Sequence, residues 1–173
     1  MKLNIQLFGG RGASSKAKER KGFGWANKDG IPVYNGKIDY TGDFSGANLS
    51  RMTNKQIADA LDKQVELNKK ALGESIGDQR TRNGRMNKIF RDARISQTEN
   101  SIKNLVSEAD KRKMPRYEIY DTKTKMVMMS AYTKNMANSG LADIKRTDAS
   151  LQKSYNWEKL PSYKIRKVTR KSK

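Results

Sequence analysis

Hydrophobic residues recur every three or four positions through the middle of the chain, the spacing of a helix that packs one face inward. The first such segment covers about residues 53–72. Thr53 and Gln56 form a capping box at its start, and Leu72-Gly73 supplies a stop signal at its end. We therefore expect a helix here that packs against its neighbours through one apolar stripe.

Two more helices are expected after it, over about residues 76–94 and 97–113. Ser96 and Glu99 form a second capping box, which places a helix start between these two segments. Met114-Pro115 ends the last of them. The pattern thus predicts a three-helix segment.

The apolar spacing then changes to that of strands. Two apolar runs around a polar turn predict a β-hairpin over about residues 117–132, and the run from Tyr163 to Val168 fits one more strand against it. Near the start of the chain, Asn35-Gly36 favours a type I′ turn and a short hairpin. A short helix over residues 148–155 is a further option. The predicted fold class is α+β, with a three-helix segment followed by a small β-hairpin or sheet.

Composition adds a strong positive charge to this picture. The 37 Lys and Arg residues against 18 Asp and Glu give a formal net charge of +19 in 173 residues. Such a surplus exceeds what solubility requires and favours a polyanionic partner, with nucleic acid as the first hypothesis. We expect a flexible basic arm over residues 1–30, a single α+β domain over 31–160 and a basic tail over 161–173.

The residue types also limit the chemistry. The chain contains no Cys and no His, which excludes disulfides, Cys/His zinc sites and catalysis by a thiol or an imidazole. It has no phosphate-binding glycine loop. Asp110, Asp121 and Lys123 faintly resemble the carboxylates and lysine of metal-dependent nucleases, but helix ends and turns collect the same residues. We therefore expect a protein that is not an enzyme and that uses neither a cofactor nor a metal.

The second predicted helix carries the most informative charge pattern. Its apolar residues are expected to pack inward, and these are Met86, Ile89, Phe90 and Ala93. A basic band with a single carboxylate, Asp92, covers most of the opposite face, whereas an ordinary solvated face mixes both signs. Such a band can neutralise several phosphates. The candidate nucleic-acid-binding residues of this band are Arg80, Arg82, Arg85, Lys88, Arg91 and Arg94.

Two further basic segments repeat this pattern. Aromatic residues among the cations of the arm suit base stacking with phosphate contact, although they could equally dock the arm on the core. A basic tail is a less specific signal. The candidates are Lys18, Arg20, Lys21 and Trp25 in the arm, and Lys164, Arg166 and Lys167 in the tail.

The Met126 to Met129 cluster is more typical of core filling than of a binding surface.

No stretch of the sequence approaches the roughly 20 apolar residues of a membrane-spanning helix. The apolar start, Met1 to Phe8, is interrupted by polar residues and is shorter than the core of a secretory signal. We therefore expect no membrane association. A basic amphipathic helix lying on a lipid surface is the less favoured alternative, because its apolar face suits a small core.

The run from Asn4 to Ser15, NIQLFGGRGASS, closely resembles a leader found on proteins encoded by tailed phages and prophages of Gram-positive bacteria. The bodies behind that leader vary greatly, so the resemblance is limited to about residues 3–15 and carries over no functional residue. It implies a phage origin, association with the assembling or ejecting particle, and a location in the host bacterial cytoplasm or the virion.

Two functions remain open at this point. The first is a basic protein that binds DNA or RNA through phosphate contacts and is associated with phage head proteins, the virion head or the genome. The second is an anti-defence inhibitor of the anti-CRISPR type. It would bind a host nuclease ribonucleoprotein, namely a Cas nuclease–guide RNA complex, and would block DNA targeting.

Overall fold

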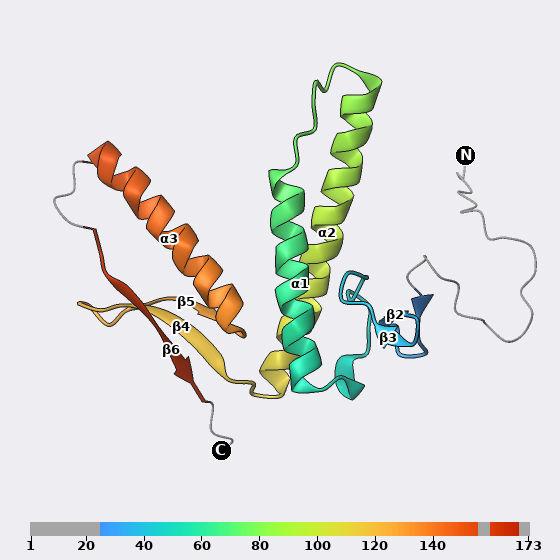
Figure 1. Ribbon diagram of the computed structural model, residues 1–173, viewed down its shortest axis with the longest axis horizontal. Helices are drawn as coiled ribbons and strands as arrows, with labels where there is room; N and C mark the ends of the chain where they lie inside the picture. The colour runs from blue at the N-terminus through green and yellow to red at the C-terminus, as the bar shows by residue number, and fades with distance from the viewer. Residues whose placement is uncertain (1–24, 156–159, 170–173) are drawn as a thin grey trace, which may run out of the picture.

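The computed structural model describes residues 25–155 and 160–169. These residues form three α-helices and two small antiparallel sheets, so the predicted α+β class is confirmed. Helices α1 (Asn54–Gly73) and α2 (Arg82–Lys111) lie side by side as an antiparallel hairpin (Figure 1). The N-terminal sheet lies beside this hairpin, and α3 (Lys134–Tyr155) lies over the second sheet.

Helix α1 begins where its capping box predicts. The Thr53 hydroxyl accepts a hydrogen bond from the Gln56 amide at 3.2 Å, and the Gln56 side chain accepts one from the Thr53 amide at 2.7 Å. Ile57 and Leu61 on the inward face are fully buried. The predicted boundaries of this helix are confirmed to within one residue.

Helix α2 corrects the prediction of two helices over residues 76–94 and 97–113. It is one helix of 30 residues that starts only at Arg82, where the Thr81 hydroxyl accepts from the Gly84 amide at 3.0 Å. Ser96 and Glu99 lie exposed in its interior. The sequence has no Gly or Pro between Gly84 and Pro115, so the backbone continues through a cap-like pair without a break.

The first hydrophobic core lies between α1, α2 and the segment before α1, which includes the 3₁₀-helix η1 (Leu49–Arg51). Phe44 enters this core and is completely buried. The Ser101 hydroxyl on α2 accepts from the Phe44 amide at 2.9 Å, and the Asn104 side chain donates to the Phe44 carbonyl at 2.7 Å. Polar side chains of α2 thus satisfy the backbone around Phe44, which lies outside any helix or strand.

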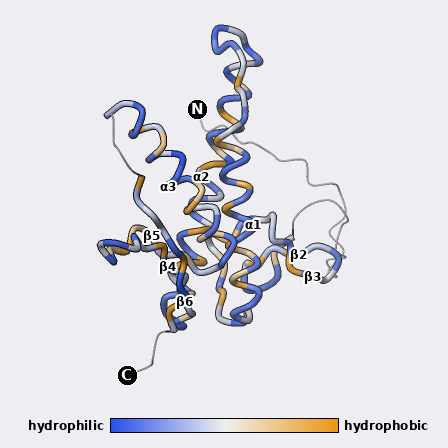
Figure 2. Tube along the Cα trace, turned by 60° about the vertical axis from the view of Figure 1, so that its left-hand side comes forward, coloured by the Kyte–Doolittle hydropathy of each residue, from blue (hydrophilic) through white to orange (hydrophobic). Residues whose placement is uncertain are grey.

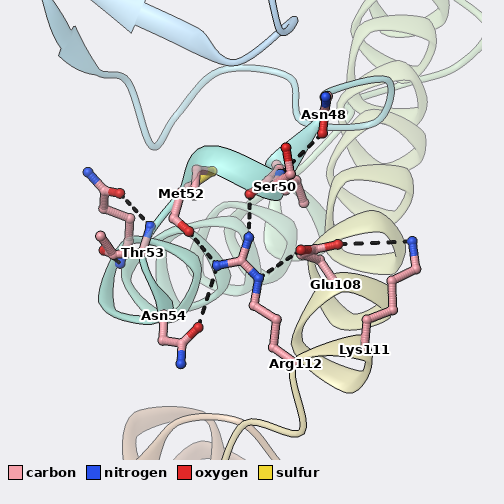
Figure 3. A network of polar contacts seen from close by, with 10 residues as sticks. Asn48, Ser50, Met52, Thr53, Asn54, Glu108, Lys111 and Arg112 are labelled. Atoms are coloured by element: carbon pink, nitrogen blue, oxygen red, sulfur yellow. Dashed lines mark hydrogen bonds and ion pairs between the residues drawn. The ribbon is translucent and has the colours of Figure 1, made fainter.

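Arg112 closes the same core at the C-terminal end of α2 (Figure 3). Its guanidinium donates to the carbonyl oxygens of Leu49, at 2.7 Å, and of Met52, and to the Glu108 carboxylate at 2.7 Å. The donors of this one side chain therefore join the end of α2 to η1 and to the start of α1. Arg112 is a structural cation rather than a binding one.

The N-terminal sheet consists of β1 (Trp25–Ala26), β2 (Pro32–Tyr34) and β3 (Lys37–Ile38) in that order. Asn35 and Gly36 connect β2 and β3 with φ angles of +49° and +74°. Two successive positive φ angles in a two-residue loop are those of a type I′ turn, so the Asn-Gly prediction is confirmed.

The second sheet has the order β5-β4-β6, with antiparallel pairing throughout. Its strands are β4 (Arg116–Asp121), β5 (Val127–Ala131) and β6 (Tyr163–Val168), which confirms both the predicted hairpin and the last strand. Helix α3 packs on one face and buries Ile119 completely. This helix is much longer than the short segment expected over residues 148–155.

Candidate nucleic-acid interface

The α1–α2 hairpin ends in a tip that we define as residues 74–94, the connection between the two helices and the first turns of α2. The tip projects beyond both sheets (Figure 1), and most of it is coloured as hydrophilic in Figure 2. The six cations of the predicted basic band all lie on this tip, and they are Arg80, Arg82, Arg85, Lys88, Arg91 and Arg94.

The sequence pattern placed Arg80 on the second predicted helix, but in the structure it lies before α2. It belongs to the turn before α2, where the Asp78 side chain accepts a hydrogen bond from the Arg80 amide at 2.9 Å. The Arg85 guanidinium donates to the Arg80 carbonyl at 2.9 Å. The turn and the first part of the helix therefore hold these two cations next to each other.

The six cations divide into two groups by their carboxylate partners. Lys88 and Arg91 both pair with Asp92, at 3.8 Å and 3.3 Å, and Arg94 pairs with Glu74. Within the described residues, no carboxylate pairs with the side chains of the other three, which are Arg80, Arg82 and Arg85. We call these three the unpaired arginines. Half of the predicted band is thus partly neutralised, and half keeps its full charge.

The unpaired arginines occupy an electrostatically unfavourable place. The first turn of α2 contains no acid, and Arg82 is its first residue. A helix N-terminus carries a partial positive charge, so a cation there typically costs about 0.3–1 kcal/mol at the surface. Bound anions reverse this cost because they neutralise the guanidinium groups and the helix end together.

The apolar stripe of the tip is exposed, which contradicts the prediction that it packs inward. Met86, Ile89 and Phe90 are 41%, 58% and 57% exposed, and Ala93 is exposed as well. The reason is that α2 is continuous, so the long buried half around Leu105 fixes which face points to α1. At 100° per residue Ile89 lies about 160° around the helix from Leu105, so it faces away from that core. Phe90 lies only about 60° from Leu105, but α1 ends at Gly73, and the next residue, Glu74, already contacts Arg91 and Arg94.

The other candidate residues do not join this surface. Lys18, Arg20 and Lys21 lie outside the described residues, as does the side chain of Trp25, whose backbone belongs to β1. Lys164, Arg166 and Lys167 lie on β6, in the sheet that is distant from the tip (Figure 1).

Arg166 on β6 already has local partners. Its guanidinium donates to the Glu118 carboxylate at 2.8 Å and 3.0 Å, and it lies 5.0 Å from the centre of the Tyr120 ring. The basic residues of β6 therefore form a separate and partly satisfied patch.

The carboxylates that faintly resembled a nuclease site have structural partners. Asp110 pairs with Arg116 at the end of α2, and the Asp121 side chain accepts from the amides of Lys123 and Thr124 at 2.6 Å and 2.9 Å. These turn hydrogen bonds lower the pKa of Asp121. Over residues 25–155 and 160–169, no group of three or more acids could hold a metal ion.

Two features were not anticipated from the sequence. The Met126 to Met129 cluster is exposed along the edge strand β5 and the turn before it, so the core-filling interpretation is wrong. A groove of about 1040 Å³ lies between β3, α1 and α3. Its charged lining mixes acids such as Asp59 and Asp62 with bases such as Lys63, so it has no single sign to select a polyanion.

The fold and this surface together define an α+β protein whose helical hairpin presents a basic tip. No helix in the described part of the chain has the length and hydrophobicity needed to cross a membrane. No protein-family model matches the chain, and neither does any curated protein or solved structure.

Proposed function

We propose that this protein is a phage-encoded, non-enzymatic nucleic-acid-binding protein that holds DNA or RNA through phosphate contacts at the hairpin tip. The observation that carries this proposal is the cluster of unpaired arginines, Arg80, Arg82 and Arg85, at the N-terminal end of α2. Each guanidinium can bind a phosphate with two parallel hydrogen bonds. The phage origin and the association with the virion head or genome rest on the leader resemblance of residues 4–15.

Two other arginines, Arg112 and Arg116, differ clearly from the unpaired arginines. Arg112 and Arg116 are enclosed by carbonyl, carboxylate and hydroxyl oxygens and have a clear role in holding the fold. The unpaired arginines are not enclosed in this way: Arg85 donates only to the Arg80 carbonyl within the described residues. Their position at the positive end of the helix dipole is unfavourable for a cation. Residues that cost stability and lie together on a projecting tip are best explained by a ligand of opposite charge.

The test is binding of labelled DNA and RNA over a salt series from about 50 to 200 mM. Replacing the three unpaired arginines with Gln should flatten the log–log salt dependence by about 0.9 per lost contact for duplex DNA, or about 0.7 for single strands. The matched control removes the same charge elsewhere, through Gln at Lys55, Lys103 and Lys123, which are exposed and outside the tip. Equal slopes for the two triple variants, or no binding at all, would remove the proposal.

A second candidate function is the anti-defence inhibitor that engages a host nuclease–guide RNA complex. The exposed apolar strand β5 favours it, because Met128 and its neighbours suit contact with another protein. Co-purification with a Cas effector and loss of target cleavage are the expected results, and Met128→Lys should abolish both. Inhibition that persists in Met128→Lys but vanishes in the triple arginine variant would place the contact at the tip instead.

A further inference from the structure

A groove of about 670 Å³ runs along the tip, between α2 and the connection that follows α1. Phe90, Asn87 and Gln97 line it from α2, together with Arg91 and Arg94, and Glu74 lines it from the connection. Its volume is within the range of sites that take small organic groups.

The wall of the groove contains an aromatic ring that remains open to solvent. Phe90 is 57% exposed although it is a large apolar residue, and no residue of α1 lines the groove beside it. A flat ring beside an open groove suits stacking with another planar group. Stacking would also remove apolar surface from water, which the fold itself does not achieve here.

The polar lining suits a base better than a phosphate. The side-chain amides of Asn87 and Gln97 make no hydrogen bond within the described part of the chain, so their donors and acceptors remain available for a base edge. The Arg94 and Arg91 guanidiniums are engaged by Glu74, the first at its carboxylate and the second at its carbonyl oxygen, 3.5 Å away. The groove therefore carries little free charge, in contrast to the unpaired arginines elsewhere on the tip.

We infer that this groove holds an unpaired nucleobase stacked on Phe90, so that the ligand of the tip is single-stranded or looped nucleic acid. The inference rests on the proposed function, because the unpaired arginines supply the phosphate contacts that bring the base to the groove. A second copy of the chain does not fit, since the two tips would bring the same cations together. An acidic peptide is the competing occupant, and the two amides with an open flat ring favour the base.

The experiment compares Phe90→Ala with Ile89→Ala, a control that is equally exposed, on the same turn of the helix, and outside the groove lining. Binding is measured with 12-nucleotide single strands and with a duplex of matched sequence. Phe90→Ala should weaken single-strand binding by about 5- to 150-fold, the range expected for one stacked base, without changing the salt slope. Ile89→Ala should leave it unchanged. Both positions are exposed, so both variants should fold, as a thermal melt will show.

The possible outcomes separate the inference from the proposed function. Equal losses in the two variants, equal loss of duplex binding, or no loss for Phe90→Ala would overturn the nucleobase assignment while the arginine test of phosphate binding stands. No binding of any nucleic acid by the unaltered protein would overturn both. In Phe90→Trp, the single strand should quench the fluorescence of the new indole. If a poly-glutamate peptide changes this fluorescence and the single strand does not, the occupant is an acidic peptide instead.

Discussion

Gly84 lies in the first turn of α2, and its replacement by Ala tests how the tip is built. In an ordinary helix, Ala is more stable than Gly by about 1 kcal/mol. Here the turn formed by Asp78 and Gln79 lies directly against Gly84. A Cβ atom at this position would be 2.5 Å from the Asp78 carbonyl carbon, closer still to its oxygen, and 3.1 Å from the Gln79 nitrogen. The substitution therefore opposes a gain in helix propensity with a backbone clash.

The magnitude follows from which atoms must move. Overpacking typically costs about 1–3 kcal/mol, and the upper half of that range applies because the obstacle is backbone rather than a flexible side chain. After the propensity gain is subtracted, we expect a net loss of about 1–2 kcal/mol. The displaced turn also carries Arg80 and accepts hydrogen bonds from the Thr81 amide and hydroxyl, at 3.1 Å and 2.8 Å. Nucleic-acid binding should therefore weaken together with stability.

Urea unfolding and amide hydrogen exchange at the tip measure both effects. The control is Gly73→Ala at the end of α1, where an added Cβ meets nothing within 4 Å and stability should not fall. If Gly84→Ala is as stable as the unaltered protein and binds nucleic acid with the same salt slope, the close approach of the turn is wrong.

Three further predictions concern the body of the protein. Ser101→Ala should cost about 1–3 kcal/mol in urea unfolding because it leaves a buried backbone amide without its acceptor, whereas the exposed Ser107→Ala on the same helix should be nearly neutral. Ser96→Ala should raise stability by up to about 0.5 kcal/mol, as in any helix interior, and a loss of about 1 kcal/mol would instead mean that a helix starts there. Burial and the hydrogen bond donated to Asp148 at 2.7 Å raise the pKa of Tyr163 to about 12. Because the ordinary and unfolded pKa is near 10, the stability that its proton contributes is complete below pH 10 and is lost as the pH rises to about 12. The pKa values of Tyr40 and Tyr132 are also raised, so an ultraviolet titration should show several late phenols, of which the one near pH 12 disappears in Tyr163→Phe. An unchanged curve in that variant would contradict the assignment.

The elements that the sequence predicted correctly depend on local chemistry. The capping box of Thr53 and Gln56 needs only atoms within one helical turn, and Asn35-Gly36 needs only two residues that tolerate positive φ. The strand from Tyr163 to Val168 was predicted from a short run bounded by apolar residues, and the structure confirms it. None of these signals depends on a distant part of the chain, which is why each could be interpreted without a structure.

The predictions that failed depended on long-range packing. The pair Ser96 and Glu99 has the composition of a helix start. The Asn68 side chain on α1, however, donates to the Ile95 carbonyl at 3.5 Å and to the Thr98 hydroxyl at 2.9 Å, so one partner contacts α2 on both sides of Ser96 and a continuous helix is favoured. Once α2 is continuous, its deep half determines the orientation of its tip. Ile89 then faces solvent because of residues more than four turns away, information that a local window does not contain.

The roles of the surplus cations also depend on long-range packing and cannot be predicted from a local stretch of sequence. From the sequence alone, Arg112 and Arg82 are two equivalent cations among many. In the structure, Arg112 donates to carbonyl oxygens of residues about sixty positions earlier. Arg82 has no carboxylate partner among the described residues and lies at a helix N-terminus, where a positive charge is unfavourable. Only the fold separates cations that hold the chain together from cations that weaken it. The unpaired arginines lie on the same tip as an exposed aromatic ring, and two side-chain amides beside that ring bond to no other described residue. Their coincidence on one projecting end is what a bound polyanion with planar bases would require.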